Sequence, residues 1–191
     1  MTLFLCSIAL AAKPDWPTLT LEERAVYDAG ELVLRADTHT SLTDSTGIVR
    51  VAAPASLLWQ EALDFRAKLP ENPTLRTLDE YARNSPNDWF VRFELNVFGI
   101  SVVIHDHWTC FPAELTCTWV QDETRESDVS REKGFLIVKP EASGSAIVFH
   151  AEFVSDVWSP GWLRRWLAND SMVNIVSKLK ERTERKAKTL P

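Results

Sequence analysis

The stretch that decides the fold is GIVRVAAPASLLWQEALDF, residues 47–65. In its first part, Val49 and Val51 alternate with other side chains at the period of two expected of a half-buried strand. Pro54 follows and sets the backbone for a turn or for the start of a helix. The second part carries apolar residues on one helical face, namely Leu58, Ala62 and Phe65. The stretch therefore predicts a strand that runs directly into a short helix.

The segments on either side predict further strands and helices. Upstream, a short helix with Thr20 as its N-cap ends at Gly30, and residues 31–36 alternate as a strand. Downstream, residues 66–73 predict a second short helix that ends at prolines. A train of strands follows at residues 75–82, 89–98, 100–110, 115–121, 134–139 and 145–154. Short turns between consecutive strands imply antiparallel pairing. From residue 159 the apolar period changes to 3.6, which predicts a long helix up to about residue 186, with a kink or new cap at 169–171.

The strand at residues 89–98 has the clearest alternation. One face carries Trp89, Val91, Phe93, Leu95 and Val97. Arg92 and Glu94 lie on the other face, which we expect to be exposed. A sheet with one apolar face needs a cover, and the last helix is the only long element left to supply it. The apolar face should therefore point to that helix or to a cavity beneath it.

This order of elements resembles the START-like superfamily (SRPBCC, Bet v 1-like, polyketide cyclase/dehydrase-type). Three motifs carry the resemblance: the opening at 47–65, GFLIVKP at 134–140 and SPGWL at 159–163. The resemblance implies an α+β helix-grip fold, in which a curved antiparallel β-sheet wraps around a long C-terminal α-helix with a hydrophobic cavity. It implies a START-like domain at 47–187, preceded at 13–46 by an N-terminal extension with a short helix and strand.

Composition narrows the class of protein. A chain of 191 residues suits one such domain, and its net charge of −6 argues against a nucleic-acid partner. Residues 1–12 are nearly all apolar and end near Ala-Leu-Ala, which predicts a signal peptide despite the absence of a basic start. A buried N-terminal strand or helix is the alternative. The signal peptide implies a periplasmic or secreted protein; without it, the protein would be cytoplasmic.

Two cysteines, Cys110 and Cys117, flank a predicted hairpin turn. In an oxidising compartment they can form a disulfide, whereas in the cytosol they would be inert, half-buried thiols. The sequence leaves both interpretations open.

The segment His105-Asp106-His107 carries the titratable groups of interest. Alternation places the two histidines on the outer face, where we expect them to be solvated, and it also predicts that His150 points outward. Asp106 shares the inward face with its apolar neighbours, where desolvation would raise its pKa. It is a candidate polar anchor for a ligand head group or a general base, with Tyr81 or a histidine as partner; a bulge that returns it to water is the alternative.

Signatures of catalysis and cofactor binding are missing from the sequence. It contains neither a nucleophile elbow nor a Gly-rich phosphate loop. We therefore assign no catalytic residue, no metal ligand and no cofactor.

Aromatic residues are abundant, with eight tryptophans in the chain. The predicted cavity-lining residues are Trp89, Val91, Phe93, Leu95, Ile104, Asp106, Trp108, Trp119, Leu136, Phe149, Trp162 and Trp166. Core packing is the simpler explanation for the tryptophans. The alternative is an aromatic cavity mouth near the start of the last helix, formed by Trp158, Trp162 and Trp166 with Arg164 and Arg165, which would suit an anionic phospholipid or a carboxylated apolar ligand.

These observations predict a monomer that binds, transports or sequesters a hydrophobic small molecule, such as a lipid, an isoprenoid or a polyketide-like compound, with transient membrane contact. The alternative is a cyclase/dehydratase-type enzyme that acts in the same cavity. A third hypothesis is a protein-interaction module. The enzyme hypothesis predicts at least two convergent polar groups inside the cavity. The carrier hypothesis predicts an almost wholly apolar cavity lining. The interaction-module hypothesis predicts that there is no cavity and that an apolar patch is exposed.

Overall fold

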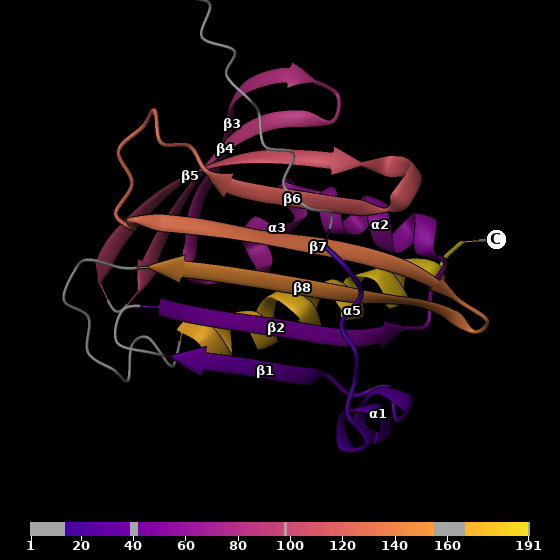
Figure 1. Cartoon of the computed structure of the whole chain (residues 1–191). Helices are drawn as coiled ribbons and strands as arrows, with labels where there is room; N and C mark the ends of the chain where they lie inside the picture. The colour runs from indigo at the N-terminus through magenta and orange to yellow at the C-terminus, as the bar shows by residue number, and fades with distance from the viewer. Residues whose placement is uncertain (1–13, 39–41, 98, 155–166, 191) are drawn as a thin grey trace, which may run out of the picture.

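The computed structural model describes residues 14–38, 42–97, 99–154 and 167–190. One layer is an eight-stranded antiparallel sheet, which curves around the helices that form the second layer (Figure 1). In spatial order the strands are β1 (Val33–Thr38), β2 (Leu42–Val51), β8 (Gly144–Val154), β7 (Arg131–Glu141), β6 (Thr116–Gln121), β5 (Ile100–Phe111), β4 (Asp88–Val97) and β3 (Leu75–Ser85). The predicted α+β helix-grip fold is confirmed.

The helices lie on both sides of the sheet, with different roles. The inner face is covered by α2 (Ala55–Leu63), α3 (Phe65–Lys68) and α5 (Met172–Ala187), as Figure 1 shows. On the outer face, α1 (Leu21–Asp28) buries Tyr27 against Val33, Ile48 and Val148. The short turns are η1 (Leu69–Glu71), η2 (Pro112–Glu114) and η3 (Leu167–Ser171), the last of which is a π-helical turn that leads into α5.

Both ends of α1 have the caps that the sequence predicts. The Thr20 side chain accepts a hydrogen bond from the Glu23 backbone, and the Glu23 carboxylate accepts one from the Thr20 backbone, which makes a capping box. Gly30 follows the helix with a φ of +77°, a conformation that glycine adopts without strain.

Helix α5 crosses the sheet in close contact with β2. A Cβ at Gly47 would lie 2.9 Å from Cγ2 of Val176, a fully buried residue of α5. A larger residue at position 47 would push the helix away from the sheet. Gly47, the first residue of the stretch 47–65, therefore allows α5 to pack closely against β2.

The register of β4 and β5 confirms the predicted strand faces. Phe93 pairs with Ile104, and Val91 pairs with Asp106, so all four belong to the inward face. Val91 is fully buried, whereas the side chain of Val97 lies outside the description. On the opposite face, Arg92 and Glu94 form an ion pair of 2.8 Å and are each about one-third exposed, less than full exposure.

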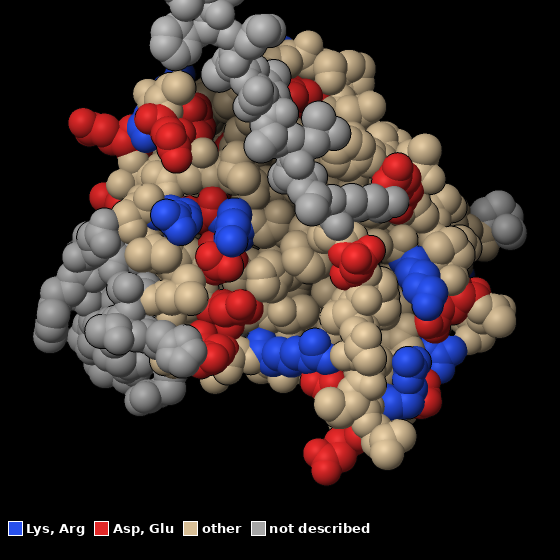
Figure 2. Space-filling model, viewed as in Figure 1, with Lys and Arg blue, Asp and Glu red and all other residues tan. Residues whose placement is uncertain are grey.

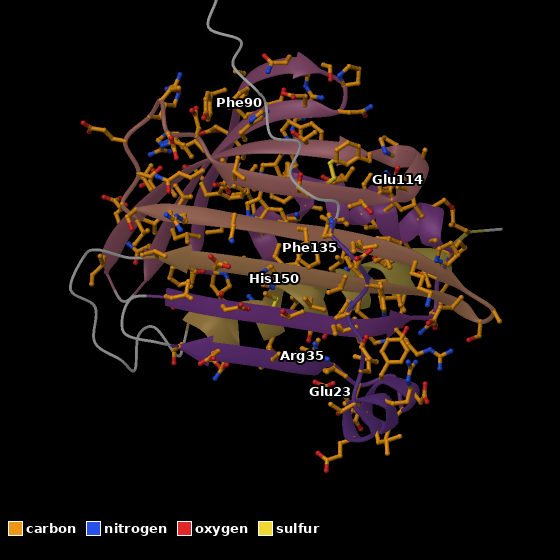
Figure 3. The ribbon with its side chains drawn as sticks, in the orientation of Figure 1. Glu23, Arg35, Phe90, Glu114, Phe135 and His150 are labelled. Atoms are coloured by element: carbon orange, nitrogen blue, oxygen red, sulfur yellow. A yellow bond between two sulfur atoms is a disulfide. The ribbon has the colours of Figure 1, made fainter. Side chains whose placement is uncertain are left out.

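The outer face of the sheet carries charged side chains of both signs. In the view of Figure 2, Lys and Arg side chains lie next to Asp and Glu side chains. Phe135 of β7 stacks on His150 of β8, and Glu23 of α1 holds Arg35 of β1 at 2.7 Å (Figure 3). Within the described residues, no helix combines the length and apolar character needed to cross a bilayer.

Candidate functional site

A cavity of about 230 Å³ lies between the inner face of the sheet and helices α2, α3 and α5. Strands β3 to β8 supply most of its wall, and α5 closes the opposite side. Most predicted cavity residues that the structure describes do line it: Phe93, Leu95, Ile104, Asp106, Trp108, Trp119, Leu136 and Phe149.

The other four predicted residues are placed differently. Trp89 and Val91 are buried on the inward face, but they belong to the packed core beside the cavity; the Trp89 ring meets Phe65 at 6.3 Å. Trp162 and Trp166 lie outside the described residues, together with the rest of the predicted aromatic mouth.

Stacked aromatic rings form the centre of the cavity wall. Trp108 of β5 and Trp119 of β6 are cross-strand partners whose rings stack at 4.4 Å, and Phe149 lies 5.0 Å from Trp119. Gly134 of β7 pairs with Trp119, and a Cβ there would overlap the indole ring. Glycine at this position therefore lets the Trp119 ring lie flat across β7.

Two carboxyl groups reach the same cavity from β5 and β7. Asp106 is 1% exposed and pairs with Gln121 of β6, and the next pair along β6 and β7 is Val120 with Lys133. That register puts Asp106, Gln121 and Glu132 in one row across three strands. Asp106 and Glu132 both line the cavity.

Burial governs the protonation of this acid pair, by which we mean Asp106 and Glu132. Desolvation raises the pKa of Asp106 well above its usual range, and the nearby charge of Glu132 raises it further. Desolvation also raises the pKa of Glu132 to about 7. Among the described residues, Oδ1 of Asp106, Oε1 of Gln121 and Oε2 of Glu132 are buried without a hydrogen-bond partner. The acid pair therefore holds at least part of a proton near neutral pH and has acceptor atoms to spare.

Cationic side chains line the helical side of the cavity. Burial lowers the pKa of Lys68 to about 7, with a further contribution from the charge of Arg182. The Lys68 ammonium lies 4.3 Å from the centre of the Phe65 ring, and part of the Lys68 side chain stays accessible to solvent. Arg182 is instead fixed by Glu61 of α2, with Nε 2.8 Å from Oε2, and Lys186 reaches the other oxygen of Glu61 at 2.6 Å.

The expected solvation of the histidines needs correction. His105 is on the outer face but only 9% exposed, because the loop after β6 covers it: its Nδ1 lies 2.9 Å from the backbone oxygen of Glu126. His107 is half-buried, stacks on Phe90 and lies 2.9 Å from Asp88.

The expected partners of Asp106 were also wrong. The hydroxyl of Tyr81 donates to Asp122 at 2.6 Å, and its ring packs against His105. Glu132, which lies between the strands predicted at 115–121 and 134–139, is the residue beside Asp106. Strand β7 begins at Arg131, so Glu132 shares its inward side with Leu136, four residues on. Extending the alternation of β7 by one pair of residues would have found it.

A disulfide and a group of potential metal ligands lie outside the cavity lining. Cys110 and Cys117 are cross-strand partners in β5 and β6 and form a disulfide, with Cα atoms 4.0 Å apart. On the outer face, ligand atoms of Asp44, His150 and Glu152 lie within 4.8 Å of one another. Glu152 is already paired with Lys133 at 3.2 Å, so this group carries no metal assignment.

Comparisons with known proteins agree with the architecture. No family model matches the chain, and no curated protein matches it. Solved structures do match. A START superfamily protein from Mycobacterium smegmatis is 21% identical, with a TM-score of 0.59, over 76% of this chain and 99% of that one. The Zhui aromatase/cyclase from Streptomyces sp. R1128 is 19% identical, with a TM-score of 0.60, over 77% and 94%.

A third match is a STAR-related lipid transfer protein (fragment 25–204) from Xanthomonas axonopodis. It is 13% identical, with a TM-score of 0.59, over 80% of this chain and 98% of that one. The chain therefore has the START-like fold.

Proposed function

We propose that this protein binds a hydrophobic small molecule in the cavity and carries or shelters it. The observation that carries the proposal is the cavity itself, whose wall is mostly apolar and aromatic. Structures of this fold that match the chain include a lipid transfer protein and an aromatase/cyclase, which supports the proposal at the level of the fold. Burial of roughly 300 Å² of apolar ligand surface would contribute about 7 kcal/mol before entropic costs.

The proposal can be tested with a substitution that places a larger side chain in the cavity. Ile104 of β5 lines the cavity, whereas its neighbour Val103 lies on the outer face. Ile104→Trp should weaken binding of a neutral fluorescent probe, N-phenylnaphthylamine, by about tenfold or more, and Val103→Trp should leave it unchanged. Native mass spectrometry of the purified wild-type protein should show a co-purifying apolar molecule. If no apolar molecule or probe binds the folded wild-type protein, the proposal is wrong.

A second candidate function is an acid–base enzyme of the cyclase/dehydratase type. The acid pair favours it, because Asp106 and Glu132 meet the requirement for two convergent polar groups inside the cavity. A protonated carboxyl can donate to a leaving or carbonyl oxygen while its ionised partner accepts a proton. The test is turnover of a linear poly-β-ketone thioester mimic. An enzyme would lose turnover in Asp106→Asn and Glu132→Gln and still bind the substrate, whereas a carrier would show no turnover in any form.

The interaction-module hypothesis fits less well, because it predicts no cavity.

Localisation is a separate proposal: a periplasmic or secreted protein is supported by the disulfide between Cys110 and Cys117. Action as a monomer with transient membrane contact also stays a proposal, which analytical centrifugation and vesicle co-sedimentation would test.

A further inference from the structure

The inner wall of the sheet carries more hydrogen-bond acceptors than the protein satisfies. Three buried oxygens, one each from Asp106, Gln121 and Glu132, have no partner among the described residues. Buried polar atoms are ordinarily paired, so an unpaired row needs an explanation. Because the row comes from three adjacent strands, its spacing is fixed by the sheet and does not depend on a mobile loop.

Within the described part of the chain, positive charge is also missing from this part of the cavity. The environment of Asp106 is set by burial, by Glu132 and by the Trp108 indole, and that of Glu132 by burial and the Trp119 indole. The cations that line the cavity stand elsewhere: Arg182 is held by Glu61, and Lys178 pairs with Glu181 at 2.9 Å. Lys68 lies over Phe65 on α3.

We propose that the acid pair is the head-group site for the ammonium of a lipophilic amine, whose apolar body fills the aromatic part of the cavity. This inference rests on the proposed binding function and names its ligand class. An ammonium supplies up to three N–H donors and one positive charge, whereas the donors that already lie beside the row, the indole N–H groups of Trp108 and Trp119, are uncharged. The stacked rings of Trp108 and Trp119 lie next to the row and offer faces to the same cation and to the chain attached to it.

An anionic ligand is the principal rival, and Lys68 would be its site. The observations favour the amine because Lys68 is a single cation, whereas Asp106 and Glu132 each present a buried oxygen without a hydrogen-bond partner among the described residues. A carboxylate placed beside Asp106 and Glu132 would add a third negative group to a dry wall.

The experiment compares three probes that share a ten-carbon chain: decylammonium, decanol and decanoate. Each displaces N-phenylnaphthylamine from the wild-type protein at pH 7.5, below micelle-forming concentrations. We expect decylammonium to bind about ten- to a hundredfold more tightly than decanol. Asp106→Asn and Glu132→Gln should remove that preference and leave decanol binding intact. Glu152→Gln, a matched carboxyl on the outer face of β8, should change nothing.

A second measurement needs no variant. Calorimetric titration of the wild-type protein with decylammonium in phosphate and in Tris should reveal release of up to about one proton, because the ammonium displaces the proton held by the acid pair. Decanol should release none. The groups that face the acid pair across the cavity are Lys68, Lys178 and Arg182, so Lys68→Met is included and should still release the proton.

The outcomes separate the two proposals. Equal binding of decylammonium and decanol, or a preference for decanoate that Lys68→Met removes, overturns the amine site and leaves the cavity function standing. No binding of any probe overturns both. If the acid-pair variants do not fold, proton release by the wild-type protein decides alone, and its absence counts against the amine.

Discussion

Two clusters of buried charge face each other across the cavity, and they are built in opposite ways. On the helical side, Glu61 of α2 accepts from Arg182 and Lys186 of α5, and its side chain is only 5% exposed. On the sheet side, Asp106 is 1% exposed and Glu132 is half-buried, and no cation contributes to the pKa shift of either carboxyl. The first cluster is complete in the sense that both oxygens of its carboxylate contact a cation, whereas no cation contact is found for the carboxyls of the second among the described residues.

This difference separates a structural role from a functional one. A buried ion pair with matched hydrogen bonds fixes two helices, and removing one member leaves an uncompensated charge. Two adjacent carboxyls whose pKa values no cation lowers destabilise the fold at neutral pH, so a structural role does not account for them. The comparison therefore points to the acid pair as the part of the cavity that acts on a ligand.

The largest effect should come from breaking the complete cluster. Glu61→Gln removes the carboxylate charge that lies 2.8 Å from Arg182, a residue only 5% exposed, and should lower the free energy of unfolding by about 3–5 kcal/mol. Urea denaturation followed by circular dichroism measures this loss. Glu181→Gln, which breaks an exposed pair with Lys178 on the same helix, should cost less than about 1 kcal/mol. Equal effects of the two substitutions would contradict the structural role of Glu61.

The opposite change is expected when the incomplete cluster is neutralised. The pKa of Glu132 is raised from 4.5 to about 7, so between these pH values the native state binds more protons than the unfolded state. Stability should therefore fall as the pH rises from about 4.5 to above 7. Glu132→Gln removes that loss and should stabilise the protein at pH 8 by up to roughly 3 kcal/mol, with little change at pH 4.5.

Denaturant titrations at both pH values provide the measurement. Glu123→Gln, an exposed carboxyl in the loop after β6, serves as the control and should be neutral at each pH. A Glu132→Gln protein that is less stable than wild type at pH 8 would mean that Glu132 has a hidden partner, and the contrast between the two clusters would disappear.

A covalent link joins β5, the strand that carries Asp106, to its neighbour β6. The disulfide between Cys110 and Cys117 closes a short loop, and the Cys110→Ala/Cys117→Ala protein should lose about 2 kcal/mol. The non-reduced, unfolded wild-type protein should expose at most the thiol of Cys6, the third cysteine of the chain. Reduction of the wild type should reproduce the loss seen in the variant. Reactive thiols at Cys110 and Cys117 would also weaken the proposed export.

The sequence predicted those parts of the site that follow from local periodicity. Alternation with a period of two placed Phe93, Ile104 and Asp106 on one face, and the short turns fixed which strands pair. Burial of Asp106 and the direction of its pKa followed from its apolar neighbours. In these cases the neighbours that matter are two residues away in the chain or directly across a hairpin.

The features of the site that could not be predicted from the sequence depend on packing between residues that are far apart in the chain. Glu61 and Arg182 are distant in sequence, and only the grip of α5 on the sheet brings them together at 2.8 Å. His105 has the predicted face but not the predicted solvation, because a loop that follows β6 folds back over it. Glu132 was missed at a strand boundary, where periodicity is weakest as a guide.

The smallest effect on stability should come from the outer face, where paired charges are partly exposed to solvent. Arg92 and Glu94 of β4 lie 2.8 Å apart and are each about one-third exposed, so water screens their attraction. A double-mutant cycle with Arg92→Ala and Glu94→Ala should give a coupling of about 0–1 kcal/mol that shrinks further in 0.5 M salt. The substitutions should leave binding of N-phenylnaphthylamine unchanged, because the pair lies on the side of β4 that faces away from the cavity. A coupling as large as that expected for Glu61 would show that burial does not govern the strength of these pairs, and the contrast between the complete and incomplete clusters would need another explanation.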